Sequence, residues 1–403
     1  MKVCYMVYRE DNVMVFDSQV LEYLKKLKTN PNIEHVKLVL FRHQDNLTCK
    51  KDVEKKILNY IDDYVTFATL APPLTMLQLN FDVLRFKKYI KMHYEEDEEI
   101  AVICRGDFAT YIGAKGFKTF ENSRILFDNR GLPIEESLMK NPNSPIYSLN
   151  RRIKKKSILY SKSHCDLYNF VTNSMRNYDI QQYGYLDNVP YSIIPTLYSA
   201  AKLDEDYLKK IKKRENYLEN QYVITYIGST EAWQLSNKLI DTIRSIFDFD
   251  RDVRFFILSN GDFDEVNSLP KELREKITIK KVPHYEMKYY LALTNLGIII
   301  RDDSIVNSVA APTKIAEYLT AGVKILYSGK IGILNDLGKI TKDCELIKID
   351  SSNEWLNYVD EDIKNKSNLK NQNKLIIKYF DMEYRQEETI NLLKKAFKNR
   401  KVR

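Results

Sequence analysis

The sequence lacks several features that would each assign a chain to a familiar class of protein. No run approaches the roughly 18 apolar residues that a membrane-spanning helix needs. Neither a G-x-G-x-x-G nor a Walker loop is present, so hydride transfer and ATP hydrolysis lose support. The cysteines are odd in number and scattered, with no Cys-x-x-Cys pair and no His at metal spacing, and we interpret them as reduced thiols: Cys4, Cys49, Cys104, Cys165 and Cys344.

The N-terminus and the charge also limit the possible locations and partners. Acidic and polar residues follow the short apolar run after Met1, so we expect a first strand rather than a signal peptide, and a cytoplasmic location. The formal net charge is +8, and the densest basic cluster, Arg151 to Lys156, has five basic positions in six. Either a solvated helix face or contact with an anionic membrane surface would explain this cluster. We expect no nucleic acid partner.

What the sequence does contain is a repeated alternation of strand-like and helix-like segments. Lys2 to Tyr8, Phe16 to Lys28 and His35 to Phe41 form a strand, a helix and a strand, which favours a parallel sheet. A second series starts at Tyr222 and alternates six strands with helices, which is typical of a Rossmann-like domain. The Lys-rich segment Leu197 to Asn220 lacks aliphatic periodicity, so we place the interdomain connection there.

The segment Arg301 to Leu326 predicts an anion-binding site. It follows a buried strand, passes through a polar loop, opens a helix near Pro312 and closes that helix at Gly322. The first helical turn leaves backbone N–H groups without partners and carries partial positive charge, which suits a phosphate. Thr313, Lys314 and Glu317 would share one face of this helix. The alternative is a surface ion pair between Lys314 and Glu317.

Further loops could contribute to binding in each half of the chain. In the second half, Gly228 allows a tight turn after a strand, and Ser229 and Thr230 can cap a helix or bind a phosphate. The backbone of Val282 and Pro283 could bind the edge of a base. In the first half, a set of loop residues follows the ends of two strands: Arg105, Gly106, Asp128, Arg130 and Gly131. A cleft would lie at these strand ends, so the residues could contact a ligand. The alternative is a solvated loop with salt bridges.

Taken together, these pieces resemble the GT-B glycosyltransferases, and among them the large retaining group usually numbered family four. The segment "APTKIAEYLTAGVKIL" is similar to the P-x-K-x-x-E-Y-L-A-x-G-x-P-V-I segment of that family. "YIGSTEAWQ", "FDNRGLPIEE" and "VFDSQVLEYLKKL" resemble the opening of its second domain, its F-D-x-R-G segment and its first helix. The pieces occur in the expected order over residues 1 to about 330, which makes the resemblance more specific than any single motif.

The resemblance implies an α/β GT-B fold with two Rossmann-like domains facing each other across a cleft. Residues 1–200 would bind the acceptor and residues 201–380 the nucleotide sugar, with a last helix in 381–403 packing back on the first domain. Glu317 would contact the ribose, and Thr313, Lys314 and Arg301 the phosphates. Gly228 and Ser229 would face the diphosphate, Lys238 would replace a phosphate-binding lysine or be solvated, and Ser18, Arg105, Gly106 and Arg130 would lie on the acceptor side.

Two departures from the family pattern affect how the donor sugar would be held. Val309 stands where the family has its first glutamate, which contacts the donor sugar. That contact would pass to the backbone of Ser308, Val309, Ala310 and Ala311. Lys324 stands where proline is usual. These departures leave the fold expectation unchanged, but they keep open the hypothesis of an inactive nucleotide-sugar-binding partner.

The resemblance also implies a reaction. A sugar would move, with retention of configuration, from a nucleotide-diphosphate sugar to a glycan or lipid-linked acceptor, as in surface polysaccharide synthesis. Arg301 and Lys314 would neutralise the leaving diphosphate without a metal or other cofactor, and Asp128 would orient Arg130 or an acceptor hydroxyl. UDP is the donor nucleotide we expect, and peripheral contact with the inner membrane surface would follow from a lipid-linked acceptor. A GT-B sugar-nucleotide epimerase is the alternative enzyme.

Overall fold

The structure is a computed structural model of the 403-residue chain. It describes residues 1–10, 15–43, 57–69, 73–184, 189–198, 202–219, 221–228, 238–249, 253–259, 263–340, 346–351, 354–365 and 373–399. The chain forms two compact units. The first consists of Met1–Pro195 together with Met382–Arg403, and the second is Thr196–Asp381.

The first unit is built on a seven-stranded parallel sheet in the order β3-β2-β1-β4-β5-β6-β7. Its middle strands are continuous apolar runs because helices cover both faces. The strands are β1 (Lys2–Tyr8), β2 (His35–His43), β3 (Asp63–Thr69), β4 (Ile100–Arg105), β5 (Ser123–Asn129), β6 (Leu167–Phe170) and β7 (Tyr191–Ile193).

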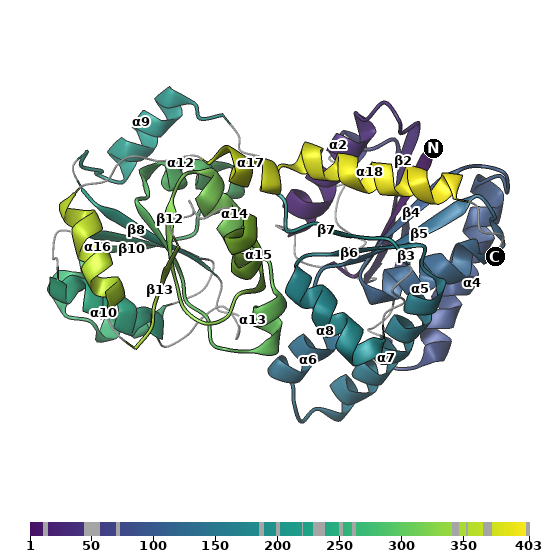
Figure 1. Cartoon of the computed structure of the whole chain (residues 1–403), viewed down its shortest axis with the longest axis horizontal. Coiled ribbons are helices and arrows are strands. Elements are labelled where there is room, and N and C mark those ends of the chain that lie inside the picture. The colour runs from purple at the N-terminus through teal and green to yellow at the C-terminus, as the bar shows by residue number, and fades with distance from the viewer. Residues whose placement is uncertain are drawn as a thin grey trace. The chain divides into compact units, whose positions relative to one another are not determined.

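Two layers of helices cover this sheet. Figure 1 shows α4, α5 and α7 on one side of it and α2 and α18 on the other. The helices of the unit are η1 (Phe16–Leu21), α2 (Glu22–Lys28), α4 (Met76–His93), α5 (Asp107–Gly116), η3 (Phe117–Thr119), α6 (Pro133–Lys140), α7 (Pro145–His164), α8 (Asn173–Tyr183) and α18 (Met382–Lys398).

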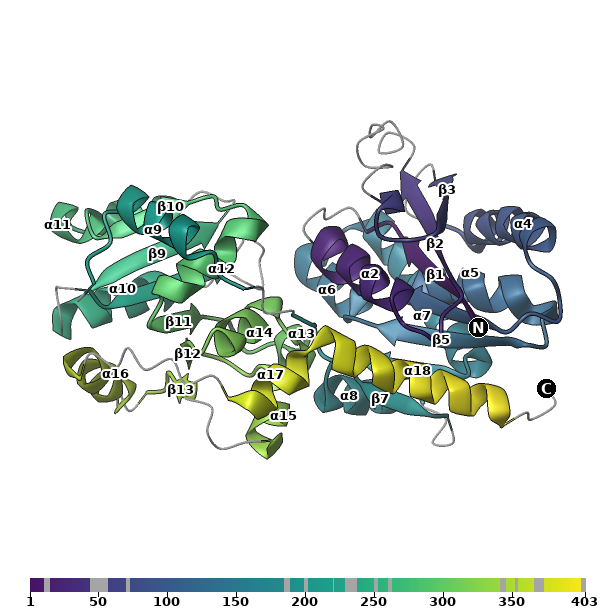
Figure 2. The same ribbon diagram turned by 90° about the horizontal axis from the view of Figure 1, so that it is seen from above.

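The last helix, α18, belongs to the first unit although it follows the second in sequence. Figure 2 shows it alongside the first unit's sheet and α2. Ile390 and Leu393 are fully buried, and the Gln386 side chain donates a hydrogen bond to the carbonyl oxygen of Tyr23 in α2. The helix therefore completes the core of the first unit.

The second unit has a six-stranded parallel sheet in the order β10-β9-β8-β11-β12-β13. The strand order reverses between β8 and β11, so the sheet has the doubly wound topology of a Rossmann fold. The strands are β8 (Val223–Gly228), β9 (Arg254–Ser259), β10 (Ile277–Lys280), β11 (Leu296–Ile299), β12 (Lys324–Tyr327) and β13 (Leu346–Lys348).

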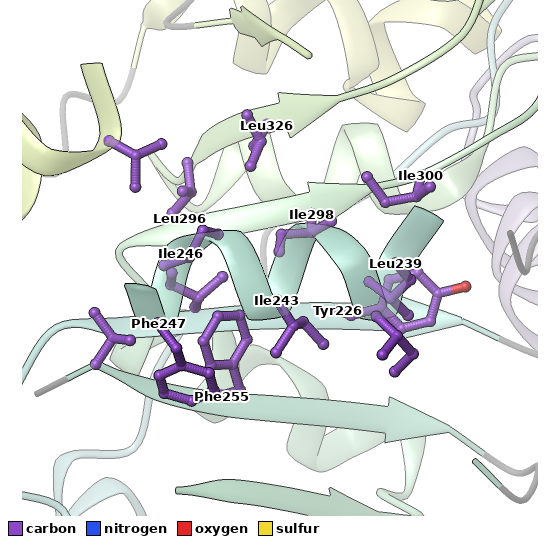
Figure 3. Packing of buried hydrophobic residues seen from close by; sticks show 14 of the residues in the cluster. Tyr226, Leu239, Ile243, Ile246, Phe247, Phe255, Leu296, Ile298, Ile300 and Leu326 are labelled. Carbon is purple, nitrogen blue, oxygen red and sulfur yellow. The ribbon is translucent and has the colours of Figure 1, made fainter. Parts of the chain in front are cut away.

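The helices of the second unit pack around this sheet over an apolar core. Figure 3 shows Leu239, Ile243 and Phe247 of α10 packed against side chains of the central strands. The helices are α9 (Glu205–Arg214), α10 (Lys238–Phe249), η4 (Asp264–Ser268), α11 (Lys271–Arg274), α12 (His284–Leu293), α13 (Ile305–Val309), α14 (Thr313–Thr320), α15 (Gly332–Ile340), α16 (Glu354–Lys364) and α17 (Lys374–Phe380).

The segment expected to connect the domains contains a helix of the second unit, α9. Polar contacts rather than aliphatic periodicity hold it in place. Arg214 donates a hydrogen bond of 2.6 Å to the Glu286 carboxylate of α12, and the Tyr207 hydroxyl donates another of 2.6 Å to the same group. The hydrophobic pattern did not reveal this helix because Ile211 is its single fully buried side chain.

Candidate functional site

The candidate site lies in the second unit, at the carboxyl ends of β8 and β11. In an open α/β sheet, ligands bind outside the carboxyl ends of the strands where the strand order reverses. Gly228 is the last residue of β8, and Arg301 follows β11 by two residues. The helix predicted to open near Pro312 and close at Gly322 is present as α14 (Thr313–Thr320), with Pro312 as its N-cap residue, and it supplies Thr313, Lys314 and Glu317.

Tyr318 connects α14 to the point where β8 and β11 separate. Its hydroxyl donates a hydrogen bond of 2.8 Å to the carbonyl oxygen of Thr225 and accepts one of 3.1 Å from the N–H of Ile227. Its fully buried ring lies over Gly297 of β11, where an added Cβ would come within 2.7 Å of the ring. The hydroxyl thus binds the backbone of β8 on both sides of Tyr226 and fixes α14 relative to the end of that strand.

Arg301 is held in place by its backbone and its side chain. Its N–H donates a hydrogen bond of 3.1 Å to the Ser328 hydroxyl, which in turn donates to the Arg301 carbonyl oxygen at 3.0 Å. Its guanidinium donates to the side-chain oxygen of Asn307. Arg301 is 5% exposed, and burial lowers the pKa of its guanidinium to about 10. The side chain is therefore a largely desolvated cation at the end of β11.

Lys314 and Glu317 lie beside Arg301 in the first turns of α14. Burial and then the Arg301 charge lower the pKa of Lys314 to about 7, against the opposing effect of Glu317. Burial raises the pKa of Glu317 to about 7 although Lys314 opposes this shift. No hydrogen bond to the Glu317 carboxyl group is present among the described residues. Such strongly shifted pKa values in one place are typical of functional sites.

Tyr226 of β8 completes this charged cluster. The Lys314 ammonium lies 5.6 Å from the centroid of the Tyr226 ring. Burial raises the pKa of Tyr226 to about 12, and Arg301 opposes that shift. Gly228 lies under the same ring, since an added Cβ there would come within 2.3 Å of it. The strand end, the loop after β11 and the helix N-terminus therefore meet around one aromatic side chain.

Two glycines position the backbone that precedes α14. Gly332, the first residue of α15, packs on this backbone so closely that an added Cβ would lie 2.8 Å from the carbonyl oxygen of Ser308. Gly329 has φ of +74°, and an added Cβ would lie 2.5 Å from the carbonyl oxygen of Arg301. The Thr196 hydroxyl donates a hydrogen bond of 2.6 Å to the carbonyl oxygen of Ala311, and the Ile333 N–H donates one of 3.0 Å to that of Ala310.

The other predicted donor-side residues have more varied surroundings. Lys238 is exposed at the start of α10, with its ammonium 3.9 Å from the Asp302 carboxylate. Val282 is buried, and Pro283 is the N-cap residue of α12. Ser229 and Thr230 lie outside the described residues.

The structure shows the surroundings of the two residues, Val309 and Lys324, that depart from the expected pattern. Val309 is 2% exposed at the end of α13, so its side chain is part of the packing. Lys324 donates a hydrogen bond to the buried Asp362 carboxylate of α16, which also accepts one from the Tyr222 hydroxyl. A proline at position 324 could not make this contact between β12 and α16.

In the first unit, the predicted acceptor-side residues meet at the carboxyl edge of the sheet. Asp128 is 2% exposed, and its carboxylate lies 2.8 Å from the Arg130 guanidinium and 3.9 Å from that of Arg105. Arg130 also donates hydrogen bonds of 3.3 Å to the carbonyl oxygens of Ile194 and Pro195. Burial lowers the pKa of Arg130, but Asp128 more than compensates and raises it above its ordinary value.

Gly106 and Ser18 complete the predicted acceptor side. Gly106 has φ of +84°, a conformation that favours glycine, and the space beside its Cα is open for at least 4 Å where a Cβ would point. It is the N-cap residue of α5. Ser18 is half-buried in η1. The contacts of these residues are structural observations, and their roles toward an acceptor stay predictions.

Sequence reasoning missed Tyr226, Tyr318 and Asn307. Tyr318 directly follows Glu317, yet its signal in the sequence is only that of a buried apolar position in an amphipathic helix. Among the described residues, no group of three or more His, Cys, Asp or Glu is placed to hold a metal ion. In the same part of the chain, no helix has the length and apolar character needed to cross a membrane.

Comparison with known sequences identifies little of the chain. No protein-family model matches it. A stretch of 96 residues, 24% of this chain, is 32% identical to ATP synthase subunit alpha from Aquifex aeolicus (strain VF5). The match spans only 18% of that relative's length, so it carries no functional argument.

Comparison with solved structures is more informative. A glycosyltransferase from Rickettsia africae ESF-5 superimposes with a TM-score of 0.67 at 12% identity, covering 99% of both chains. Anabaena HepE, in a complex with UDP and glucose, gives 0.65 at 12% identity over 97% of this chain and 99% of that one. A candidate UDP-N-acetylglucosamine 2-epimerase from Listeria monocytogenes gives 0.55 at 12% identity, over 100% and 97%. The two parallel sheets and these full-length matches show that the chain has the GT-B fold, as the sequence predicted.

Proposed function

We propose that the chain is a glycosyltransferase that takes a sugar from a nucleotide-diphosphate sugar. The observation that carries this proposal is the cluster of Arg301, Lys314 and Glu317 where the strand order of the second sheet reverses. Two desolvated cations beside one carboxylate leave a positive site at a helix N-terminus, which matches a diphosphate. That Anabaena HepE has been solved with UDP supports UDP as the nucleotide.

Each residue of the cluster has a proposed role in this reaction. The Glu317 carboxylate accepts hydrogen bonds from the ribose hydroxyls. Arg301, Lys314 and the first N–H groups of α14 bind the diphosphate and stabilise the negative charge that grows on it as the sugar leaves. Because two protein cations face that charge, we propose that neutralisation needs no metal ion. Removing one such contact would cost on the order of 2 to 4 kcal/mol of transition-state stabilisation.

In this proposal, the backbone of residues 308–311 binds the donor sugar. The Val309 side chain is buried and apolar, so it offers no polar group to a sugar hydroxyl. Gly332 fixes the path of the backbone at Ser308 and Val309 by its close contact with both residues. We propose transfer with retention, in which the leaving phosphate oxygen takes the proton of the acceptor hydroxyl on the same face of the sugar.

We propose that the acceptor is a glycan or lipid-linked sugar of a surface polysaccharide, and that the sugar is transferred to it in the cytoplasm. Arg105 and Gly106 lie at the carboxyl edge of the first sheet, where a ligand of that unit is expected. Arg130 and Asp128 bind each other and the carbonyl oxygens of Ile194 and Pro195, so we assign them the role of positioning this edge.

A donor screen tests the proposed function. The protein is incubated with UDP-, GDP-, ADP- and CDP-sugars, and its thermal unfolding is followed. A ligand present at about one hundred times its dissociation constant stabilises the native state by about 2.7 kcal/mol, so a binding donor should raise the Tm clearly. Nucleotide release on adding candidate acceptors would support a transferase, whereas a screen in which no nucleotide sugar raises the Tm would contradict the proposal.

Two other outcomes distinguish the alternative functions. The fold is shared with a candidate sugar-nucleotide epimerase, so conversion of one donor sugar into another without any acceptor would favour that activity. Tight nucleotide binding with no turnover in any donor and acceptor combination would favour an inactive binding partner, consistent with Val309 in place of a carboxylate.

A further inference from the structure

The first unit exposes apolar side chains along the outer face of α4. Leu77 is 79% exposed, Phe81 60% and Leu84 64%. They are spaced by four and three residues, so they lie on one line along the helix. The same line continues through Lys88 to Lys91 and Met92. The inner face of α4, with Leu79, Val83 and Phe86, already packs on the protein core. The outer line is therefore not needed for folding of the unit.

A matching line runs along α7. Leu149, Arg152, Lys156 and Leu159 follow each other at intervals of three or four residues, and all four side chains are exposed. Ile146 and Tyr147, in the first turn of the same helix, are exposed as well. Aliphatic and basic side chains thus share the outer face of α7.

The two lines belong to one surface. The Asn150 side chain of α7 donates a hydrogen bond of 2.7 Å to the carbonyl oxygen of Pro73, just before α4. Between the helices, Tyr111 of α5 donates a hydrogen bond of 2.7 Å to Asn80 of α4 and makes an edge contact with Tyr160 of α7. Figure 1 shows α4, α5 and α7 on the same side of the sheet. We call the outer faces of α4 and α7 the α4–α7 surface.

The charge of the α4–α7 surface is of one sign. Helix α7 contains no Asp or Glu, and its exposed charged residues include Arg152, Lys155 and Lys156. The single acidic residue of α4, Asp82, is buried and accepts a hydrogen bond from the Tyr8 hydroxyl. The acidic run of residues 95–99 follows the end of α4, at the opposite end of that helix from Leu77.

We propose that the α4–α7 surface binds peripherally to an anionic lipid bilayer. Exposed leucine and aromatic side chains between lysines and arginines on helices that lie in one layer are suited to the boundary between headgroups and acyl chains. Basic residues near such a surface each strengthen binding to anionic lipids. A protein partner for this surface would need acidic groups to match the basic residues, and a bilayer supplies them over any area.

The proposed docking would also orient the first unit. Helix α4 follows β3, and α7 follows β5 through α6, so Leu77 and Ile146 lie near the carboxyl edge of the sheet. Gly106 lies at this same edge. This inference rests on the proposed function only in that a lipid-linked acceptor would then enter near the residues assigned to the acceptor.

Vesicle flotation of the full-length chain tests the inference. Vesicles of phosphatidylcholine alone are compared with vesicles that also contain phosphatidylglycerol, at low and high salt. We expect binding to the phosphatidylglycerol vesicles that weakens with salt, and little binding to phosphatidylcholine alone. The Leu77→Ser/Phe81→Ser variant should bind at least about tenfold more weakly, because two apolar side chains no longer enter the bilayer.

Matched variants keep the result specific to this surface. Leu218 and Leu375 are exposed leucines of the second unit, so Leu218→Ser/Leu375→Ser should leave vesicle binding unchanged. A Lys155→Gln/Lys156→Gln variant should lose binding to anionic vesicles by more than about tenfold, at roughly 1 kcal/mol for each charge. Thermal unfolding checks that each variant is folded, and nucleotide-sugar binding, measured in parallel, tests the proposed function separately.

Three outcomes would overturn the inference. The first is wild-type protein that does not float with phosphatidylglycerol vesicles, and the second is a Leu77→Ser/Phe81→Ser variant that floats as the wild type does. The third is a wild-type chain that forms a dimer in gel filtration while the same variant is monomeric, because the surface would then be an interface between copies of the chain.

Discussion

Replacing Tyr318 by Phe removes one oxygen atom from the point where β8, β11 and α14 meet. The Tyr318 hydroxyl holds both Thr225 and Ile227 of β8, through hydrogen bonds of 2.8 and 3.1 Å. The phenyl ring of the variant still fits over Gly297, so the change tests the hydrogen bonds and not the packing. Without the hydroxyl, the Thr225 carbonyl and the Ile227 N–H each lose the partner that α14 supplies.

The magnitude follows from these two bonds. A buried polar group that loses its partner costs about 1 to 3 kcal/mol, so two such groups should lower the free energy of unfolding of the second unit by about 2 to 6 kcal/mol. For a domain of about 150 to 250 residues, each kcal/mol shifts the Tm by about 2 to 4 °C, so we expect a decrease of at least about 4 °C. Because Lys314 and Glu317 are carried by the same helix, nucleotide-sugar affinity should also fall, by about tenfold, which corresponds to about 1.4 kcal/mol.

Calorimetric titration with the donor found in the screen, together with thermal unfolding, measures both effects. Tyr222→Phe is the matched control, because it removes a buried tyrosine hydroxyl that donates a hydrogen bond to Asp362, just before the amino end of β8. That variant should lose stability and keep its donor affinity. If Tyr318→Phe lowers the Tm but binds the donor as tightly as Tyr222→Phe does, the reasoning that Tyr318 positions the binding residues is wrong.

Three further predictions concern the same site. Glu317→Ala should weaken nucleotide-sugar binding by about tenfold or more in a calorimetric titration, since a hydrogen bond to a charged group is worth about 1.5 to 3 kcal/mol, and unchanged affinity would refute its contact with the ribose. Affinity should rise with pH up to about 7 as Glu317, whose pKa is raised to about 7, loses its proton, and should fall above that pH as Lys314, whose pKa is lowered to about 7, loses its own. Titrations over about pH 6 to 9 check this, and a falling limb that persists in Lys314→Met would contradict the assignment. Gly329→Ala should destabilise the chain by about 2 kcal/mol or more in chemical unfolding, because its positive φ and the contact with the Arg301 carbonyl leave no room for a Cβ. Gly338→Ala, at an open position of α15, should be neutral or slightly stabilising, and equal losses in the two glycine variants would count against this reading.

The fold was predictable because its signal is local and repeated. Strands such as β1 and β8 are buried on both faces, so they are apolar runs of about the length expected for a parallel sheet, and amphipathic helices separate them. The cluster around Lys314 and Glu317 could be predicted for a similar reason. A strand, a loop and a helix N-terminus in that order are close in sequence, and the helical spacing fixes which side chains share a face.

The remaining features depend on contacts that join distant parts of the chain. Tyr318 looks like any buried helix residue until Ile227 of β8, which lies 91 positions earlier in the sequence, is placed beside it. The Arg214–Glu286 ion pair that holds α9 joins residues 72 positions apart and leaves no periodic pattern. Lys324 is a departure from the family pattern in sequence, and it becomes intelligible only when Asp362 of α16 is seen to accept its hydrogen bond.

The position of α18 has a consequence for the order in which the chain can fold during its synthesis. The second unit lies between Pro195 and Met382, so all of its strands leave the ribosome before α18 is made. Until then, the first unit lacks the helix that buries Ile390 and Leu393 and contacts the backbone of Tyr23. The second unit can therefore finish folding before the first, although it is synthesised later. Until α18 is made, part of the sheet of the first unit stays uncovered. A nascent chain that stalls before α18 would present that uncovered face to chaperones.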